Sequence, residues 1–309
     1  MPLTRALLRI SSSRWLARGG PLDTLCVLMT QPSAPPRAHV VAGGFPRSSA
    51  AGHDIDHARL RILELLQENG RATASVAPDF ADLDEWLPRS DLLVTYVAGP
   101  FPDDDRCKLL EDWLEGGGRW LALHGTSGGK AVPLPDGRPG RTMKRLPHHD
   151  VLGGFFLNHP PIRAFTVDVC DADHPLTRGL PDSFEVMDEL YLLELLSPEA
   201  THVLLTTKDL GADDPAPRKF GFTYDDDTSV GADGATRALG YVCERGRGAV
   251  AYFALGHCHT PSTNIQPFVD ASVDPEGTTP LSFRGPWETE AFGRLLRNGI
   301  EWGLLADRG

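Results

Sequence analysis

Two apolar runs without polar alternation, Asp91–Ala98 and Arg119–Leu123, constrain the fold of this chain more than any other feature. Strands that are apolar on both sides are typical of parallel sheets, because crossover helices cover both sheet faces. Amphipathic stretches lie between such runs, so strand and helix alternate along the first half of the chain. The sequence therefore predicts an α/β fold with an open, mostly parallel sheet and helices on both faces.

The predicted helices have clear start and stop signals. Ile55–Leu66 has apolar residues at helical spacing, and Asn69-Gly70 supplies a stop. A second helix runs from Asp103 to Leu114, with three acidic residues in its first turn, where they complement the helix dipole. Thr289–Leu305 is predicted as a closing amphipathic helix.

The remaining strands are predicted from short apolar runs. They are His39–Phe45, Ala72–Ala77, Ile162–Val169, His202–Thr207, Arg237–Glu244 and Ala249–Leu255. The last two are joined by Arg245–Gly248 and form a predicted hairpin. Residues 126–148 and 209–236 are rich in Gly, Pro and charge, and are predicted as long loops. We expect a single domain over residues 37–309.

Charge excludes some partners. The 309 residues carry 30 basic and 42 acidic side chains, a net charge of −12, which argues against nucleic acid or an anionic membrane as a partner. No apolar run reaches the roughly 18 residues of a membrane span. Residues 1–36 hold four arginines and one aspartate, a net +3 that leaves −15 for the rest. This leader is either a targeting peptide or a flexible, mis-assigned start ahead of Met29.

Cysteine use and loop composition exclude further classes. The five cysteines are an odd set without CxxC spacing, so we expect neither a disulfide framework nor a thiolate zinc site, and the cytoplasm is the default location. The chain lacks a GxGxxG or Walker loop, and no nucleotide cofactor is expected.

Histidines mark the candidate site. His124 follows the Arg119–Leu123 strand and His257 follows the last strand, so both should face the rim where the carboxyl ends of the strands meet. The segment Asp188–Tyr191 adds two carboxylates and a phenol. Histidines that converge with a glutamate suit a metal site or an acid–base pair.

We assign three groups of site residues from this pattern. The catalytic candidates are His124, Glu189 and His257. The candidate ligands of a divalent metal ion are His124, His159 and His257, and the candidate substrate-binding residues are His53, Asp188, Tyr191 and Trp287.

Each assignment has a structural alternative. A histidine at a strand end can simply bond loop backbone, and His53 and His57 can belong to a helix cap. His148 and His149 lie in a basic loop and are expected to face solvent. His174, before a proline, is expected to organise a turn. Trp86, Trp287 or Phe155 could stack on a sugar, although large aromatic residues usually pack in the core.

The turn at His124 has the shape of a nucleophile elbow, in which a strand is followed by a sharp turn and small residues. Histidine stands at the apex where hydrolases and amidotransferases have Ser or Cys, so thiol acyl transfer is disfavoured. Cys258, between His257 and His259, is the alternative thiol.

Taken together, these motifs resemble the ThuA-like (trehalose utilisation) family, in the class I glutamine amidotransferase-like superfamily. The matching residues include Gly43-Gly44, Gly52-His53-Asp54, Leu123-His124-Gly125, Gly153-Gly154 with His159, His174-Pro175, Asp188-Glu189 with Tyr191, and Gly256-His257. The resemblance implies a flavodoxin-like fold and carbohydrate metabolism without amidotransferase activity. The leader and the loops 128–147 and 209–236 depart from the pattern and leave the substrate open.

The resemblance implies a sugar substrate, in a family often found beside dehydrogenases that make keto-sugars. Our hypothesis is a lyase, hydrolase or isomerase step on a keto-glycoside or disaccharide such as a trehalose derivative. A histidine or Glu189 would remove a proton next to a carbonyl, and a metal or cationic histidine would stabilise the product anion. The alternatives are a non-catalytic sugar-binding or regulatory module and a metallohydrolase for another substrate. The oligomeric state stays open, a homodimer included.

Overall fold

A nine-stranded sheet forms the centre of the computed structural model, which describes residues 34–44, 52–210 and 220–305. In sheet order its strands are β2 (Thr73–Ala77), β1 (Arg37–Gly43), β3 (Leu92–Val97), β4 (Arg119–Leu123), β13 (Gly248–Phe253), β12 (Arg237–Arg245), β11 (Thr201–Thr207), β8 (Arg163–Val169) and β9 (Ser183–Asp188). Neighbours from β2 to β13 are parallel, and neighbours from β13 to β9 are antiparallel. The predicted β12–β13 hairpin is confirmed.

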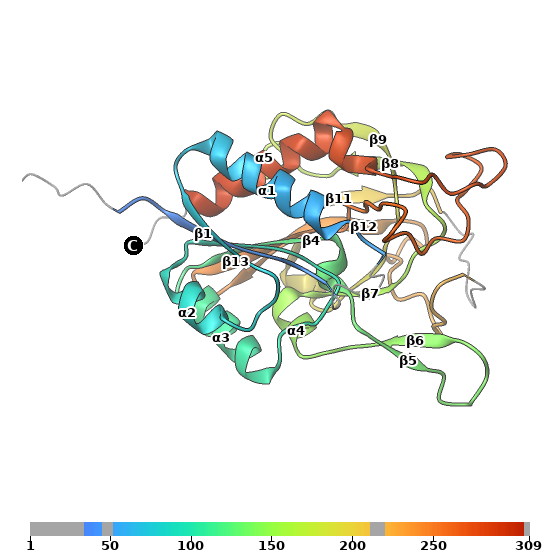
Figure 1. Ribbon diagram of the computed structural model, residues 1–309, viewed down its shortest axis with the longest axis horizontal. Coiled ribbons are helices and arrows are strands. Elements are labelled where there is room, and N and C mark those ends of the chain that lie inside the picture. The colour runs from blue at the N-terminus through green and yellow to red at the C-terminus, as the bar shows by residue number, and fades with distance from the viewer. Residues whose placement is uncertain (1–33, 45–51, 211–219, 306–309) are drawn as a thin grey trace, which may run out of the picture. The chain divides into compact units, whose positions relative to one another are not determined.

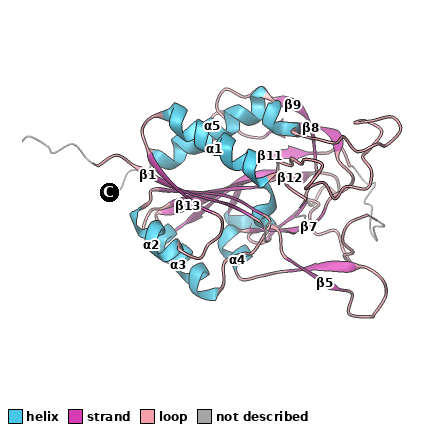
Figure 2. Cartoon of the chain, in the orientation of Figure 1, coloured by secondary structure: helices cyan, strands magenta, loops and turns pink. Residues whose placement is uncertain are grey.

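Helices cover both faces of this sheet, as Figure 1 and Figure 2 show. On one face α1 (Ile55–Asn69) packs against α5 (Glu290–Leu304), which also contacts β3 and β4. The other face carries α2 (Leu83–Trp86), α3 (Asp104–Glu115) and α4 (His148–Leu152). The predicted α/β fold, with its parallel strands and two helical layers, is confirmed.

Residues 126–148 are more structured than the predicted loop. A 3₁₀ turn, His124–Ser127, leads into the short hairpin of β5 (Lys130–Pro133) and β6 (Arg141–Lys144), and α4 follows. A separate two-stranded sheet pairs β7 (Gly154–Asn158) with β10 (Leu192–Leu195). Further 3₁₀ turns span Leu87–Arg89, Pro198–Ala200 and Gly285–Glu288. The β5 and β6 strands have only four residues each, all exposed or half-buried, so they carry no hydrophobic pattern that the sequence could reveal.

The predicted helix signals work as caps. The Asp54 side chain accepts a hydrogen bond from the His57 backbone N–H (3.2 Å) at the start of α1. Gly70 ends that helix in the left-handed conformation (φ 67°), as the sequence indicated. Asp103 caps α3 in the same way, through the Arg106 N–H (3.0 Å). The α1 amino terminus, with His53 just before it, is tied to the segment after β13 by the hydrogen bond from the Asp54 N–H to the Cys258 carbonyl oxygen.

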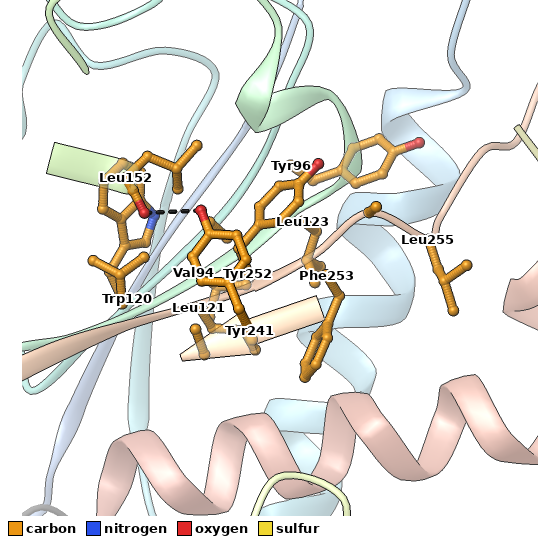
Figure 3. Packing of buried hydrophobic residues seen from close by; sticks show 14 of the residues in the cluster. Val94, Tyr96, Trp120, Leu121, Leu123, Leu152, Tyr241, Tyr252, Phe253 and Leu255 are labelled. Atoms are coloured by element: carbon orange, nitrogen blue, oxygen red, sulfur yellow. Dashed lines mark hydrogen bonds between the residues drawn. The ribbon is translucent and has the colours of Figure 1, made fainter. Parts of the chain in front are cut away.

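The core extends from the middle of the sheet to this rim (Figure 3). Its buried aromatic residues satisfy their polar atoms: Tyr241 donates to the Leu152 carbonyl oxygen (2.9 Å), and Trp120 Nε1 donates to Thr95 Oγ1 (2.9 Å). Tyr252 donates to the His124 carbonyl oxygen (2.8 Å). The core therefore holds the backbone of the turn at His124 directly.

That turn is strained. His124 has a φ of 43°, in the left-handed region that few residues other than glycine adopt. The next residue, Gly125, lies so close to β3 that an added Cβ would be 2.5 Å from the Val97 carbonyl oxygen. The sharp turn inferred from the sequence is thus held by two contacts, the close approach of Gly125 to β3 and the hydrogen bond from Tyr252 to His124.

Replacing Gly125 with alanine is expected to lower the free energy of unfolding by about 1–3 kcal/mol, because the new Cβ must displace backbone rather than a side chain. Urea unfolding measures the change. Gly293→Ala in α5 is the control: its Cβ would meet only the mobile end of Arg297, and alanine favours helix. Equal stability of Gly125→Ala and wild type would contradict the proposed close approach.

Residues 35–309 form one unit by their contacts, whereas most of the leader expected over residues 1–36 lies outside the described residues. Within the described part of the chain, the helices are all too short or too polar to cross a bilayer.

Candidate functional site

Four side chains from distant parts of the chain meet at the rim of the sheet. His53, His124, Glu189 and His257 each offer one ligand atom, and these atoms lie within 4.8 Å of one another. His124 follows β4 and His257 lies just beyond β13, the adjacent parallel strand, so their rings are 5.8 Å apart between centroids. Glu189 directly follows β9. All but His53, which is half-buried, are buried.

Glu189 lies at the centre of the group. Its Oε2 is 3.3 Å from His124 Nε2, and its Oε1 is 3.2 Å from His257 Nδ1. His159 Nε2 is 3.5 Å from Oε1, and Gln266 Nε2 donates to the same oxygen. A single buried carboxylate thus faces three imidazole rings and one amide.

The electrostatics of this group favour a carboxylate together with positive charge. Burial alone would raise the pKa of Glu189, but His159, His257 and His124 hold it well below its usual range. Burial likewise opposes a charge on His124, but the hydrogen bond to Glu189 and the charges of Asp188 and Glu189 raise the pKa of the His124 ring. The negative charge of Glu189 is therefore stabilised by positive charge between the carboxylate and the histidines. Either protons on the histidines or a bound metal ion can provide that charge.

The orientation of His124 is set by the backbone. Its Nδ1 lies 2.7 Å from the Ala254 carbonyl oxygen, which only accepts, so Nδ1 carries a proton. In the neutral ring Nε2 then presents a lone pair towards Glu189. Tyr191 lies 3.1 Å from that nitrogen, and burial raises the pKa of its phenol well above the usual value, so its hydroxyl is a donor.

The group fits a divalent metal ion. Imidazole nitrogens and a carboxylate are the donors that zinc and similar ions take, with ligand atoms about 3.4 Å apart around a tetrahedral ion. The separations of 3.2 and 3.3 Å between Glu189 and the two histidine nitrogens agree with that spacing. His257 Nδ1 is buried and makes no hydrogen bond within the described part of the chain. Buried polar atoms normally have a partner, so this nitrogen is suited to bind a metal ion.

The candidate ligand group keeps His124 and His257 from the set named from the sequence, adds Glu189, which was assigned a catalytic role, and differs in two histidines. His159, a predicted ligand, lies beside the group rather than in it, whereas His53, assigned to substrate, is inside it. The Asp54 N–H donates to the Cys258 carbonyl oxygen (2.7 Å), which draws the residue after His53 against the strand end that carries His257. This tertiary contact brings the His53 ring to 4.9 Å from that of His124.

Asp188, also assigned to substrate, instead holds backbone. Its Oδ1 accepts from the N–H groups of Glu189 (2.8 Å) and His257 (3.0 Å), and its Oδ2 accepts from Gly256 (2.7 Å). Burial raises its pKa to about 6, although His124 and the Gly256 hydrogen bond act in the opposite direction. The carboxylate ties the end of β9 to the segment that carries His257, which makes Asp188 a positioning residue.

Of the aromatic residues predicted for sugar stacking, Trp287 and Phe155 are buried and Trp86 is half-buried. Trp287 is 7% exposed and its Nε1 donates to the Gly256 carbonyl oxygen (2.7 Å), while Trp86 stacks on His39 and Phe155 packs against His149. The burial of Trp287 and Phe155 follows from the core role that large aromatic residues usually have.

A separate aromatic face, which is exposed, leads to the cluster. Phe268 is 46% exposed and its ring lies 5.3 Å from that of Phe220. The Phe220 ring in turn lies 5.6 Å from that of His159. Two phenyl rings thus lead from solvent to His159, which lies 3.5 Å from the Glu189 carboxylate. The sequence showed no pattern that singles these rings out.

His148 and His149 do not face solvent, contrary to the prediction. Both are fully buried, and their Nε2 atoms lie 3.2 Å from the Thr126 and 3.0 Å from the Ser127 carbonyl oxygens. Burial lowers the pKa of both rings, so they act as neutral donors. Helix α4 places both rings against the backbone that follows His124. Composition alone could not show this contact. His174 does organise a turn, because its Nδ1 accepts from the Leu176 N–H (3.2 Å).

Cys258 is poorly suited to be a nucleophile. Its side chain is buried, and burial raises its pKa to about 12, so the group is a thiol rather than a thiolate. Its Sγ lies 3.6 Å from the Tyr96 hydroxyl oxygen. This agrees with the sequence argument against thiol acyl transfer.

Comparison with known proteins identifies the family. Residues 45–268 match the ThuA family, described as trehalose utilisation. A ThuA-like protein of Bacteroides uniformis is 17% identical over 88% of this chain and 92% of its own, with a TM-score of 0.54. One from Parabacteroides merdae is 16% identical over 88% and 91%, with a TM-score of 0.53. None of the curated proteins matches the chain. Because the match spans most of the sequence and the solved relatives share the fold, this chain belongs to the ThuA family.

Proposed function

We propose that this protein is a metal-dependent enzyme of carbohydrate metabolism that acts on a keto-glycoside or disaccharide by lyase, hydrolase or isomerase chemistry. The observation that carries the proposal is the buried Glu189 carboxylate among histidine rings, in a chain of the trehalose-utilisation family. Family membership supports a carbohydrate, and the donor set supports a metal ion.

In this proposal Glu189, His53, His124 and His257 hold the metal. The bound ion would polarise a carbonyl or hydroxyl oxygen of the sugar. His159 would move a proton to or from the sugar, because its side chain is 13% exposed while those of His124 and His257 are fully buried.

Two other groups would orient the reactants. Tyr191 remains a phenol and donates a hydrogen bond, either to His124 or to a sugar oxygen beside it. Asp188 keeps the backbone of Glu189 and His257 at a constant distance, because one carboxylate bonds both N–H groups.

The test is elemental analysis of the purified protein, followed by a panel of oxidised and unoxidised disaccharides. We expect bound metal and turnover of at least one oxidised sugar, both lost after chelation. Binding of sugars without turnover under any metal would instead favour a non-catalytic sugar-binding module. Absence of both sugar binding and turnover, with metal present, would point to another substrate for the same centre.

Phe268→Ala is expected to weaken disaccharide affinity by about 3–10-fold, because a sugar ring would lose its stacking contact. Affinity for the matching monosaccharide should change less, since a single ring at the metal lies deeper. Titration calorimetry with both sugars measures this. Leu281→Ala, a more exposed apolar residue of the same segment, is the control. Equal affinities for wild type and Phe268→Ala would exclude this stacking face.

A further inference from the structure

We infer that His259 is a positioning residue that fixes the tautomer of His257, so that the nitrogen facing Glu189 carries a lone pair. The inference rests on the proposed metal site. Three contacts in sequence support it: His259 Nε2 lies 2.9 Å from the Pro280 carbonyl oxygen, His259 Nδ1 lies 2.9 Å from His257 Nε2, and His257 Nδ1 lies 3.2 Å from Glu189 Oε1.

The proton positions follow from the end of this chain of contacts. The Pro280 carbonyl oxygen only accepts, so His259 Nε2 donates to it. His259 is fully buried, and its Nδ1 faces the His257 ring. In the neutral ring Nδ1 accepts, and His257 Nε2 must be its donor. His257 Nδ1 is then left with its lone pair towards Glu189.

A lone pair facing a carboxylate is unfavourable unless a cation lies between them. Metal ligation by histidine commonly depends on a partner that takes the proton of the other ring nitrogen and so orients the ring. His124 has such a partner in the Ala254 carbonyl oxygen, and His259 supplies the equivalent for His257. The two buried histidines therefore present bare nitrogens to opposite oxygens of Glu189.

One loop connects both ends of this arrangement. His259 and Phe283 exchange backbone hydrogen bonds of 2.9 Å each, which close the segment 260–282. Pro280 within it accepts from His259, and Gln266 within it donates to Glu189. The loop thus holds the carboxylate through Gln266 and one imidazole through His259, so the same segment orients two members of the proposed ligand group.

The experiment separates the two hydrogen bonds of His259. Asparagine places an amide oxygen where Nδ1 was and keeps the acceptor for His257, whereas glutamine reaches Pro280 but loses that acceptor; leucine keeps neither. Binding of Co²⁺ is measured by titration calorimetry and by the visible spectrum of the bound ion. We expect the dissociation constant to rise about 10–100-fold in His259→Leu and His259→Gln, with an altered spectrum. His259→Asn should keep most of the affinity and the wild-type spectrum.

Controls distinguish this role from a general loss of packing. His39→Leu removes another buried, hydrogen-bonded histidine, in β1, and should leave Co²⁺ binding unchanged. Equal affinity in wild type, His259→Leu and His259→Gln would overturn the inference while leaving the metal site intact. Equal losses in the Asn and Gln variants would also overturn it, because the acceptor would then not matter. If His259→Leu does not fold, the Asn–Gln pair decides. Wild-type protein that binds no Co²⁺, Zn²⁺ or Mn²⁺ would refute the metal site itself.

Discussion

Replacing Glu189 with glutamine is expected to weaken binding of a divalent metal by at least about 100-fold, more than the loss of a residue that only supports a ligand. The carboxylate is the negative centre of the group, with both oxygens within 3.3 Å of histidine nitrogens. Glutamine keeps the shape but removes the charge and one acceptor oxygen, so the imidazoles lose the anion that makes a cation favourable among them. Equilibrium dialysis against Co²⁺ with metal analysis measures the change, and turnover should be lost with it.

The matched control is Glu194→Gln in β10, a half-buried glutamate outside the ligand group. It should bind metal as wild type does. Because glutamine removes charge without creating a cavity, Glu189→Gln should fold, and circular dichroism checks this. A Glu189→Gln protein that binds Co²⁺ as tightly as wild type would show that the cluster is not the metal site.

Replacing Asp188 with alanine is expected to lower the free energy of unfolding by about 3–5 kcal/mol, since it leaves buried N–H groups without an acceptor. Those groups belong to Glu189, Gly256 and His257. Each unsatisfied buried donor costs about 1–3 kcal/mol, partly recovered as the segment relaxes. Urea unfolding at pH 8, above the raised pKa of about 6 at which this carboxyl ionises, measures the change.

Two variants bracket the Asp188 result. Asp188→Asn keeps an acceptor at one atom but puts an amide N–H at another, so its stability should lie between those of wild type and Asp188→Ala. Glu185→Ala removes an exposed carboxylate from the same strand and should change stability by less than about 0.5 kcal/mol. A loss no larger than that in Asp188→Ala would show that these hydrogen bonds do not support the site.

The predictable parts of the fold are those with local physical signals. The β3 and β4 runs are apolar on both sides, and Asp54, Asp103 and Gly70 act as caps where short-range rules place them. The short strands β5 and β6 were not predicted, because four-residue strands whose side chains are exposed or half-buried leave no periodic pattern in the sequence.

The site likewise has parts that the sequence predicts and parts that it does not. The approach of His124 and His257 could be predicted, because both follow parallel strands whose carboxyl ends share an edge. The exchange of His159 for His53 in the ligand group could not, since it depends on the Asp54–Cys258 contact between segments about 200 positions apart. The roles of His259 and Gln266 could not be predicted either, because they depend on how the 260–282 loop folds. His259 contacts His257, and Gln266 donates a hydrogen bond to Glu189.

The amino-acid sequence by itself determined the α/β class, the parallel strands of the sheet and the rim on which the histidines gather. These features follow from burial patterns and chain direction, which are local or periodic. Only the tertiary structure decided which histidines face Glu189, that Asp188 holds backbone, and that His148 and His149 are buried. Such outcomes depend on where loops fold back and on which hydrogen-bond partner a side chain meets there, and neither is encoded within a short window of sequence.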